Sequence, residues 1–169
     1  MSKLFTYSGT PSIAKIHSNS PMGFWVQKAE DFITWTQQNQ QKPERDLIFR
    51  ATYVLDTLGK FLIADRHSEH VACAGGQSVL AEGEVGFTIQ KKSVVIEEIS
   101  NYSTGYCPDV LCFAEVQKTL NQINVLHPNW WTREAVFRRC LNCKEKNLVK
   151  DSWFYCLICY APLTENWNL

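Results

Sequence analysis

Apolar residues in the middle of the chain recur in short runs that predict a β-sheet. Between residues 46 and 100 these runs are rich in β-branched and aromatic residues, and turn-forming residues separate them. The turn at residues 56–59 (Asp-Thr-Leu-Gly) divides the first two runs and predicts a hairpin. The runs span residues 47–55, 60–64, 71–74, 79–88 and 93–100. About five short strands joined by tight turns imply a mainly antiparallel sheet.

Two flanking segments carry apolar residues at the three- and four-residue spacing of a helix. The first spans residues 22–38, and the second runs from Asp109 to about residue 123. Asp109 is the expected N-cap of the second helix, because its carboxylate can accept backbone N–H groups of the first turn. Residues 1–20 are mixed and polar, which indicates a loop or a short edge strand. We therefore expect an α+β domain over residues 1–128, in which two helices cover the sheet.

Four cysteines near the C-terminus form two pairs with C-x₂-C spacing. Each pair directs two thiolates to one point, and two pairs complete the tetrahedron that Zn²⁺ prefers. Between the pairs, residues 147–155 are expected to form a hairpin that returns the chain to the metal. The expected ligands of one structural Zn²⁺ are Cys140, Cys143, Cys156 and Cys159. Because sulfur fills all four positions, no position is open for a catalytic water.

Residues 129–169 are therefore predicted to be a separate zinc-ribbon module. Many ribbons carry glycine directly after the second cysteine of each pair, because the backbone adopts a positive φ there. Lys144 and Tyr160 occupy these positions here. We expect the same turns to form at a modest conformational cost.

Charge and hydropathy narrow the range of partners. The chain has 17 basic and 17 acidic residues, so its global charge favours neither nucleic acid nor a membrane surface. No apolar stretch approaches the roughly 20 residues that span a bilayer, and we expect no membrane contact. The N-terminal residues lack the pattern of a secretory signal, and cysteines paired at this spacing favour metal binding over disulfides. The sequence thus predicts a cytoplasmic protein.

A polar cluster at residues 66–70 is one candidate for catalysis. It contains His67, Glu69 and His70, which could supply a general base and the carboxylate that orients it. On a strand these side chains would alternate between two faces, so they could meet one substrate only if the segment is a loop. The alternative is a solvated turn at a strand end.

The segment from residue 103 to residue 108 is the second candidate. It joins a strand to a helix N-terminus, where backbone N–H groups and the helix dipole favour anions. The residues expected to contact an anionic ligand such as a phosphate are Ser103, Thr104, Gly105 and Tyr106. An ordinary strand-to-helix turn is the alternative. In an enzyme for a nucleotide-type substrate, Ser103 and Tyr106 would join the cluster at residues 66–70.

Two further predictions concern Cys107 and a set of four glutamates. Cys107 precedes the helix, where a lowered thiol pKa would make it a nucleophile. Four glutamates alternate along the predicted strands and are expected on exposed faces. They are Glu82, Glu84, Glu97 and Glu98.

Several short motifs follow one another in the order of a known domain. A strand-turn-strand at residues 53–65 precedes His67-Ser68, then residues 74–76 (Ala-Gly-Gly) and the segment 99–108 that leads into a helix. In this order, residues 47–125 resemble the central domain of plant IQ-motif calmodulin-binding proteins and of related bacterial proteins, some of them toxin-like. The resemblance implies a fold more than a reaction. The chain has no IQ motif, so calmodulin binding is not implied.

The sequence leaves three functional hypotheses open. The first is a zinc-binding accessory or regulatory protein that recognises a protein or a small anionic ligand. The second is a toxin-like effector enzyme that acts on a nucleotide-type substrate. The third is nucleic-acid binding through the zinc-ribbon module, whose cations alternate with aromatic rings. These cations are Arg133, Arg138, Arg139, Lys144, Lys146 and Lys150.

Overall fold

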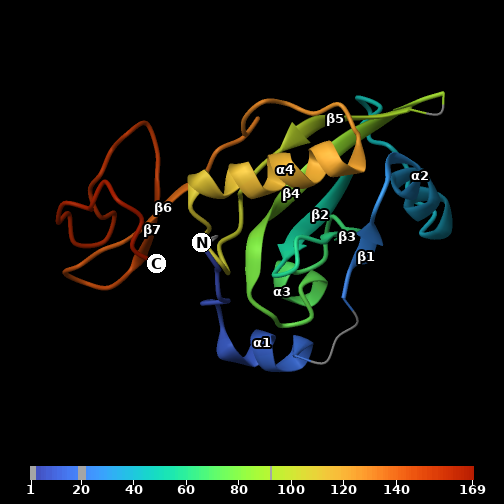
Figure 1. Cartoon of the computed structure of the whole chain (residues 1–169). Coiled ribbons are helices and arrows are strands. Elements are labelled where there is room, and N and C mark those ends of the chain that lie inside the picture. Colours follow the sequence, from blue (N-terminus) through green and yellow to red (C-terminus); the bar gives the residue numbers. More distant parts are fainter. Residues whose placement is uncertain (1–2, 19–21, 92) are drawn as a thin grey trace.

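A five-stranded sheet forms where the apolar runs predict one. The computed structural model describes residues 3–18, 22–91 and 93–169, and Figure 1 shows their arrangement. The strands are β1 (Phe24–Val26), β2 (Phe49–Asp56), β3 (Phe61–Asp65), β4 (Val79–Gln90) and β5 (Ser93–Ile99). They lie in the order β1-β3-β2-β4-β5, and every neighbouring pair is antiparallel. The predicted α+β class with a mainly antiparallel sheet is confirmed.

Aromatic rings fix the helix α2 (Ala29–Gln38) on the sheet. Tyr53 of β2 stacks on Phe61 of β3, with the ring centroids 4.9 Å apart. Phe32 of α2 lies 4.7 Å from Phe87 of β4, again between ring centroids. All four rings are buried, and burying one phenylalanine side chain contributes about 1.5–3 kcal/mol. α2 is therefore held on the sheet face that carries Tyr53.

The second predicted helix forms as α4 (Phe113–Ile123), which the 3₁₀ turn η1 (Val110–Cys112) precedes. Asp109 is the N-cap of η1, because its Oδ1 accepts the backbone N–H of Leu111 at 3.2 Å. The apolar side of α4 is buried and packs against β4. Figure 1 shows α4 crossing the sheet near β4 and β5.

Residues 22–38 do not form the single helix that their spacing predicts. Residues 24–26 form the edge strand β1, which pairs with β3, and the helix begins only at Ala29. The carboxylate of Asp31 accepts the backbone N–H groups of Gln27 at 2.8 Å and Lys28 at 3.1 Å. These bonds satisfy the first turn of α2 and end the strand before it.

The apolar run at residues 71–74 is a helix and not the predicted strand. It forms α3 (His70–Cys73), which packs against β2 and β3. Gly75 and Gly76 adopt φ values of 59° and 77°, and the N–H of Gly76 donates to the carbonyl of Val71. A left-handed pair of this kind closes a helix C-terminus, whereas it would interrupt a strand.

The N-terminal segment is partly extended and partly helical. Phe5 forms an isolated antiparallel bridge with Val79, which agrees with the predicted edge strand. Residues 11–17 instead form α1 (Pro11–His17), which begins at a proline whose fixed φ suits the first helical turn. Residues 1–2 and 19–20 of the predicted loop lie outside the described residues.

The cysteine-rich end contains a second, two-stranded sheet of β6 (Val136–Arg139) and β7 (Lys146–Val149). The predicted hairpin over residues 147–155 is wrong, because its first residues belong to β7, which pairs with the preceding strand β6. The chain then turns at residues 150–153, where the N–H of Trp153 donates to the carbonyl of Lys150. We call residues 136–163 the ribbon; it lies beside the sheet at the left of Figure 1.

The residues that flank the ribbon on both sides are hydrogen-bonded to the rest of the chain. The side chain of Asn101, which follows β5, donates to the carbonyl of Ala135 at 2.8 Å and accepts the N–H of Ala135 at 2.7 Å. The indole N–H of Trp167 donates to the carbonyl of Cys107 at 2.9 Å. A domain boundary near residue 128 stays a prediction.

None of the helices in the described part of the chain has the length and apolar character needed to cross a membrane.

Candidate functional site

The two cysteine pairs lie on turns that share one hydrogen-bond pattern. In the first, the N–H of Cys140 donates to the carbonyl of Glu145, and the N–H of Lys144 donates to the carbonyl of Cys140. The second repeats both bonds, from Cys156 to Ala161 and from Tyr160 to Cys156. Lys144 and Tyr160 have φ values of 68° and 58°, which is the positive φ expected at the position where many ribbons have glycine. The sequence therefore builds two matching turns, and each presents two thiols.

The four sulfur atoms gather at one point. All four Sγ atoms lie within 4.8 Å of one another. The distance from Cys140 Sγ to Cys159 Sγ is 3.6 Å, and that from Cys143 Sγ to Cys156 Sγ is 3.5 Å. A tetrahedron with metal–sulfur distances of about 2.3 Å has sulfur–sulfur edges of about 3.8 Å, whereas a disulfide bond measures about 2.0 Å. The spacing fits four ligands around one metal ion.

Neighbouring N–H groups support the thiolate form of Cys156 and Cys159, which is the form that binds a metal. Asn142 Nδ2 donates to Cys159 Sγ at 3.4 Å and lowers the pKa of Cys159 to about 6. The backbone N–H of Cys159 lowers the pKa of Cys156, and the N–H of Ile158 also donates to Cys156 Sγ at 3.4 Å. Metal binding releases thiol protons, so groups that stabilise thiolates favour it.

Apolar side chains project from the tips of both cysteine turns. Leu157 and Ile158 lie between the second pair of cysteines and are 65% and 68% exposed. Leu141, in the first turn, and Tyr160, after the second, are likewise exposed. Elsewhere in the ribbon, Trp153 and Tyr155 form an exposed ring pair with centroids 4.9 Å apart. We call Leu141, Leu157, Ile158 and Tyr160 the ribbon tip.

Arg138 is bound inside the chain and is not available to nucleic acid. It is buried, and its Nη1 donates to the carbonyl of Phe137 at 2.7 Å. Its Nε donates to the carbonyl of Thr164 at 3.1 Å, and Nη2 donates to that of Glu165. Arg138 therefore anchors the C-terminal residues to the ribbon.

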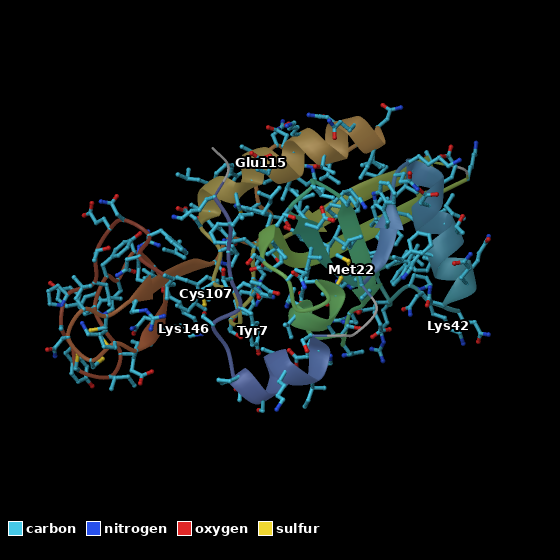
Figure 2. The ribbon with its side chains drawn as sticks, turned by 60° about the horizontal axis from the view of Figure 1, so that its bottom comes forward. Tyr7, Met22, Lys42, Cys107, Glu115 and Lys146 are labelled. Atoms are coloured by element: carbon cyan, nitrogen blue, oxygen red, sulfur yellow. The ribbon has the colours of Figure 1, made fainter. Side chains whose placement is uncertain are left out.

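Other cations of the predicted basic patch also contact the chain itself. Lys146 Nζ donates to the carbonyls of Ser8 and Thr104, each at 3.1 Å. Figure 2 shows Lys146 near Tyr7 and Cys107, where the ribbon meets the rest of the molecule. The remaining contacts join Arg139 to the carbonyl of Lys144, Lys144 to the carbonyl of Leu141, and Arg133 to the ring of Tyr102. These contacts weaken the case for a phosphate-binding surface.

A separate pocket brings several of the predicted site residues together. It has a volume of about 360 Å³ and lies between the N-terminal segment, the start of α3 and the turn after β5. Its lining residues are Tyr7, Gly9, Thr10, Ile13, Glu69, His70, Glu84, Tyr102, Ser103, Thr104 and Gly105. We call it the Glu69 pocket. The two candidate segments of the sequence therefore meet in it.

His67 and Tyr106 do not line this pocket. His67 is exposed on the turn after β3, where its backbone N–H donates to Asp65 Oδ1 at 2.9 Å. Tyr106 is buried, and its hydroxyl donates to the carbonyl of Gln77 at 2.8 Å. The buried thiol of Cys107 donates to the carbonyl of Thr104, and burial raises the pKa of Cys107 to about 11. A thiol in that state is a poor nucleophile.

His70 has a defined hydrogen-bonding state. Its Nε2 lies 3.0 Å from the carbonyl oxygen of Gly83, and a carbonyl can only accept, so Nε2 carries the proton. Burial lowers the pKa of His70 below its ordinary value. The ring is therefore neutral near pH 7, and Nδ1 is a hydrogen-bond acceptor.

Two glutamates of β4 differ from the sequence prediction. Glu82 is fully buried, and neither of its carboxylate oxygens has a hydrogen-bond partner among the described residues. Glu84 is half-buried and lines the Glu69 pocket. The prediction of exposed faces fails for Glu82 because β4 is an inner strand whose central residues are covered. The alternation of glutamates in the sequence does not reveal that the centre of β4 is buried.

Comparison with known proteins adds no relative. No protein-family model, curated protein or solved structure matches the chain. The resemblance of residues 47–125 to the IQ-motif proteins therefore stays a prediction.

Proposed function

We propose that this protein binds one Zn²⁺ through its four paired cysteines and uses the ribbon tip to dock onto a partner protein. Four sulfur ligands at tetrahedral spacing favour zinc over the harder cations, which prefer oxygen. With all four positions occupied by sulfur, the ion has a structural role. Thiolate ligands also need a reducing compartment, which supports a cytoplasmic location.

The exposed apolar side chains of the ribbon tip carry the docking proposal. Fifteen large hydrophobic residues are exposed in the described part of the chain, and six of them lie between residues 141 and 160. Aliphatic and aromatic side chains held on a rigid turn make favourable anchors, because little conformational entropy is lost on binding. The metal would supply that rigidity here.

The partner we propose is a protein with an apolar groove that accepts the aliphatic tips. The side chains of Leu141, Leu157 and Ile158 have no charge and no hydrogen-bond donor that a nucleic-acid base could use. The cations nearby are largely engaged within the chain. A surface of this kind matches the apolar centre of a protein interface better than the charged groove that single-stranded nucleic acid needs.

A photo-crosslinking residue placed at position 158 tests this proposal. Position 126 is the matched control, because Leu126 is 71% exposed and lies outside the ribbon. The partner cross-linked from position 158, once purified, should bind the full chain in calorimetry. Leu157→Asp should weaken that affinity at least tenfold, which corresponds to about 1.4 kcal/mol, whereas Leu126→Asp should change it less than twofold.

Three results would overturn the docking proposal. One is equal cross-linking from positions 158 and 126. Another is equal weakening by Leu157→Asp and Leu126→Asp when both variants keep their metal. The third is capture of a nucleic acid whose affinity falls steeply with salt, since that dependence marks phosphate contacts.

A further inference from the structure

We infer that the Glu69 pocket binds a small organic cation that carries a protonated amine or a guanidinium group. No residue of the ribbon lines this pocket, and the inference does not rest on the docking proposed for the ribbon. The pocket volume of about 360 Å³ lies in the range of small-molecule sites. Its walls come from segments far apart in the sequence: residues 7–13, 69–70, 84 and 102–105.

The charge of the lining indicates a cationic ligand. Glu69 and Glu84 both line the pocket, and no lysine or arginine does. Neither glutamate belongs to the ion pairs of the described residues, which join other carboxylates to Lys3, Arg50 and Arg66. Two carboxylates without a cationic partner in one small pocket attract positive charge and repel phosphate.

The hydrogen-bonding character of the pocket agrees with its charge. His70 has its Nε2 proton committed to the carbonyl of Gly83, so its remaining ring nitrogen is an acceptor. The carboxylates of Glu69 and Glu84 are acceptors as well. A ligand that donates several N–H bonds fits these groups, and an ammonium or guanidinium group donates three to five.

Nearby cations do not neutralise the pocket from within. Lys146 Nζ donates to the backbone carbonyls of Ser8 and Thr104. Arg133 lies over the ring of Tyr102, with its guanidinium carbon 4.7 Å from the ring centroid. Neither residue lines the pocket. Both are bound by groups other than Glu69 and Glu84.

The distances between the acceptor groups favour an organic cation over a metal ion as the ligand. Within the described residues, only the four cysteines bring three or more metal-type ligand atoms close together. Glu69, His70 and Glu84 are therefore too far apart to hold one ion in their present positions. A cation of several atoms can reach groups on different walls, whereas a single ion cannot.

The anion predicted for the turn at residues 103–106 has little support here. Asp109 already occupies the N-terminus of η1, where it accepts the N–H of Leu111. The turn also closes on itself, because the N–H of Cys107 donates to the carbonyl of Ser103 at 2.8 Å. These N–H groups are thus engaged within the chain.

Titration with agmatine, which has an amine at one end and a guanidinium at the other, tests the inference by NMR on the full chain. We expect saturable shifts at the amides of residues 69–70, 84 and 102–105. Glu69→Gln and Glu84→Gln keep the side-chain shape and should each weaken the affinity at least fivefold. Glu30→Gln is the matched control, because Glu30 is exposed on α2, and it should leave the affinity unchanged.

Two matched probes test whether binding depends on the positive charge of the ligand. 1,4-Butanediol has a similar chain length without charge, and inorganic phosphate carries the opposite charge; neither should shift these amides at the concentrations where agmatine saturates. The inference is overturned if phosphate or butanediol binds as well as agmatine. It is also overturned if agmatine shifts no pocket amide, or if its affinity is the same in the folded Glu69→Gln, Glu84→Gln and Glu30→Gln variants.

Discussion

Glu82 lies in the middle of β4 with its carboxyl group enclosed by the fold. Its side chain is fully buried, and its oxygens have no hydrogen-bond partner among the described residues. Burial raises the pKa of Glu82 well above its ordinary value, because a carboxylate in this apolar surrounding would lose its hydration. The folded protein therefore keeps a proton that the unfolded chain releases above about pH 4.3.

Replacement of Glu82 by glutamine should remove a pH-dependent loss of stability. The folded pKa is raised, so stability is greatest below the unfolded pKa and falls as the pH rises towards the folded value. The difference in unfolding free energy between Glu82→Gln and wild type should grow with pH by up to about 1.4 kcal/mol per unit. Urea denaturation from pH 5.5 to 8 measures it, and Glu30→Gln is the exposed control. A constant difference across this range would show that Glu82 does not carry the proton.

Single residues differ in how far the sequence reveals their role. The cysteine ligands are predictable because their spacing within each turn fixes their geometry. Arg138 and Glu82 are not, since their burial depends on residues far away in the chain, such as Thr164 and the elements that cover β4. The Glu69 pocket could be predicted from the sequence only in part. Its two candidate segments are visible in the sequence, but their meeting with each other, and with Tyr7 and Glu84, depends on the tertiary fold.

At the scale of elements, each cysteine turn depends on a residue with positive φ. Lys144 and Tyr160 adopt this conformation at 68° and 58°, and a residue with a Cβ atom is destabilised there by about 1–2 kcal/mol relative to glycine. Glycine avoids this cost, but part of its advantage is lost because glycine has greater conformational freedom in the unfolded chain. The turns are therefore formed against a small local strain that metal binding would outweigh.

Lys144→Gly should hold the metal more tightly than Lys144→Ala. Both variants lose the contact of Lys144 Nζ with the carbonyl of Leu141, so their difference isolates the backbone conformation. We expect the glycine variant to bind zinc about two- to fivefold more tightly, which corresponds to about 0.4–1 kcal/mol. Competition with a chromophoric chelator measures this ratio. Equal or weaker binding by the glycine variant would mean that the backbone at residue 144 is not strained.

Element boundaries were predicted less well than the elements with long apolar patterns. β2, β4 and β5 follow from runs of β-branched and aromatic residues, and α4 follows from its spacing and from Asp109. The short apolar segments at residues 24–26 and 71–74 carry no such signal, because a few apolar residues fit a strand or a helix equally well. Edge pairing with β3 decides the first, and the two glycines after α3 decide the second.

At the scale of the whole molecule, the ribbon and the main sheet have different sources of stability. The sheet surrounds a large aromatic and aliphatic core. Around the proposed metal site, the core of the ribbon consists of Cys140, Cys156 and Leu163, with the other two cysteines and a few apolar side chains packed around them. Phe137 of the ribbon packs instead with Cys107 and Ala135. So small a core does not hold a fold without a metal or another cross-link. The ribbon should therefore depend on its ion, and the sheet should not.

Removal of the metal should unfold the ribbon and leave the sheet intact. Hydrogen exchange followed by mass spectrometry, before and after chelation, should show loss of protection across residues 140–163. Amides of β2 and β4 should keep their protection, because their hydrogen bonds lie within the main core. Loss of protection in both regions at once would show that the two parts form one cooperative unit.

Native mass spectrometry of the purified full chain under reducing conditions tests the central claim most directly. We predict a mass excess equal to one zinc ion minus the two protons that its charge replaces, which disappears in Cys143→Ser and Cys159→Ser. It should remain in Cys112→Ser, because Cys112 is buried in the main core, away from the four sulfur ligands. A chain that carries no metal, or a different metal, and keeps residues 140–163 protected from exchange would contradict the account.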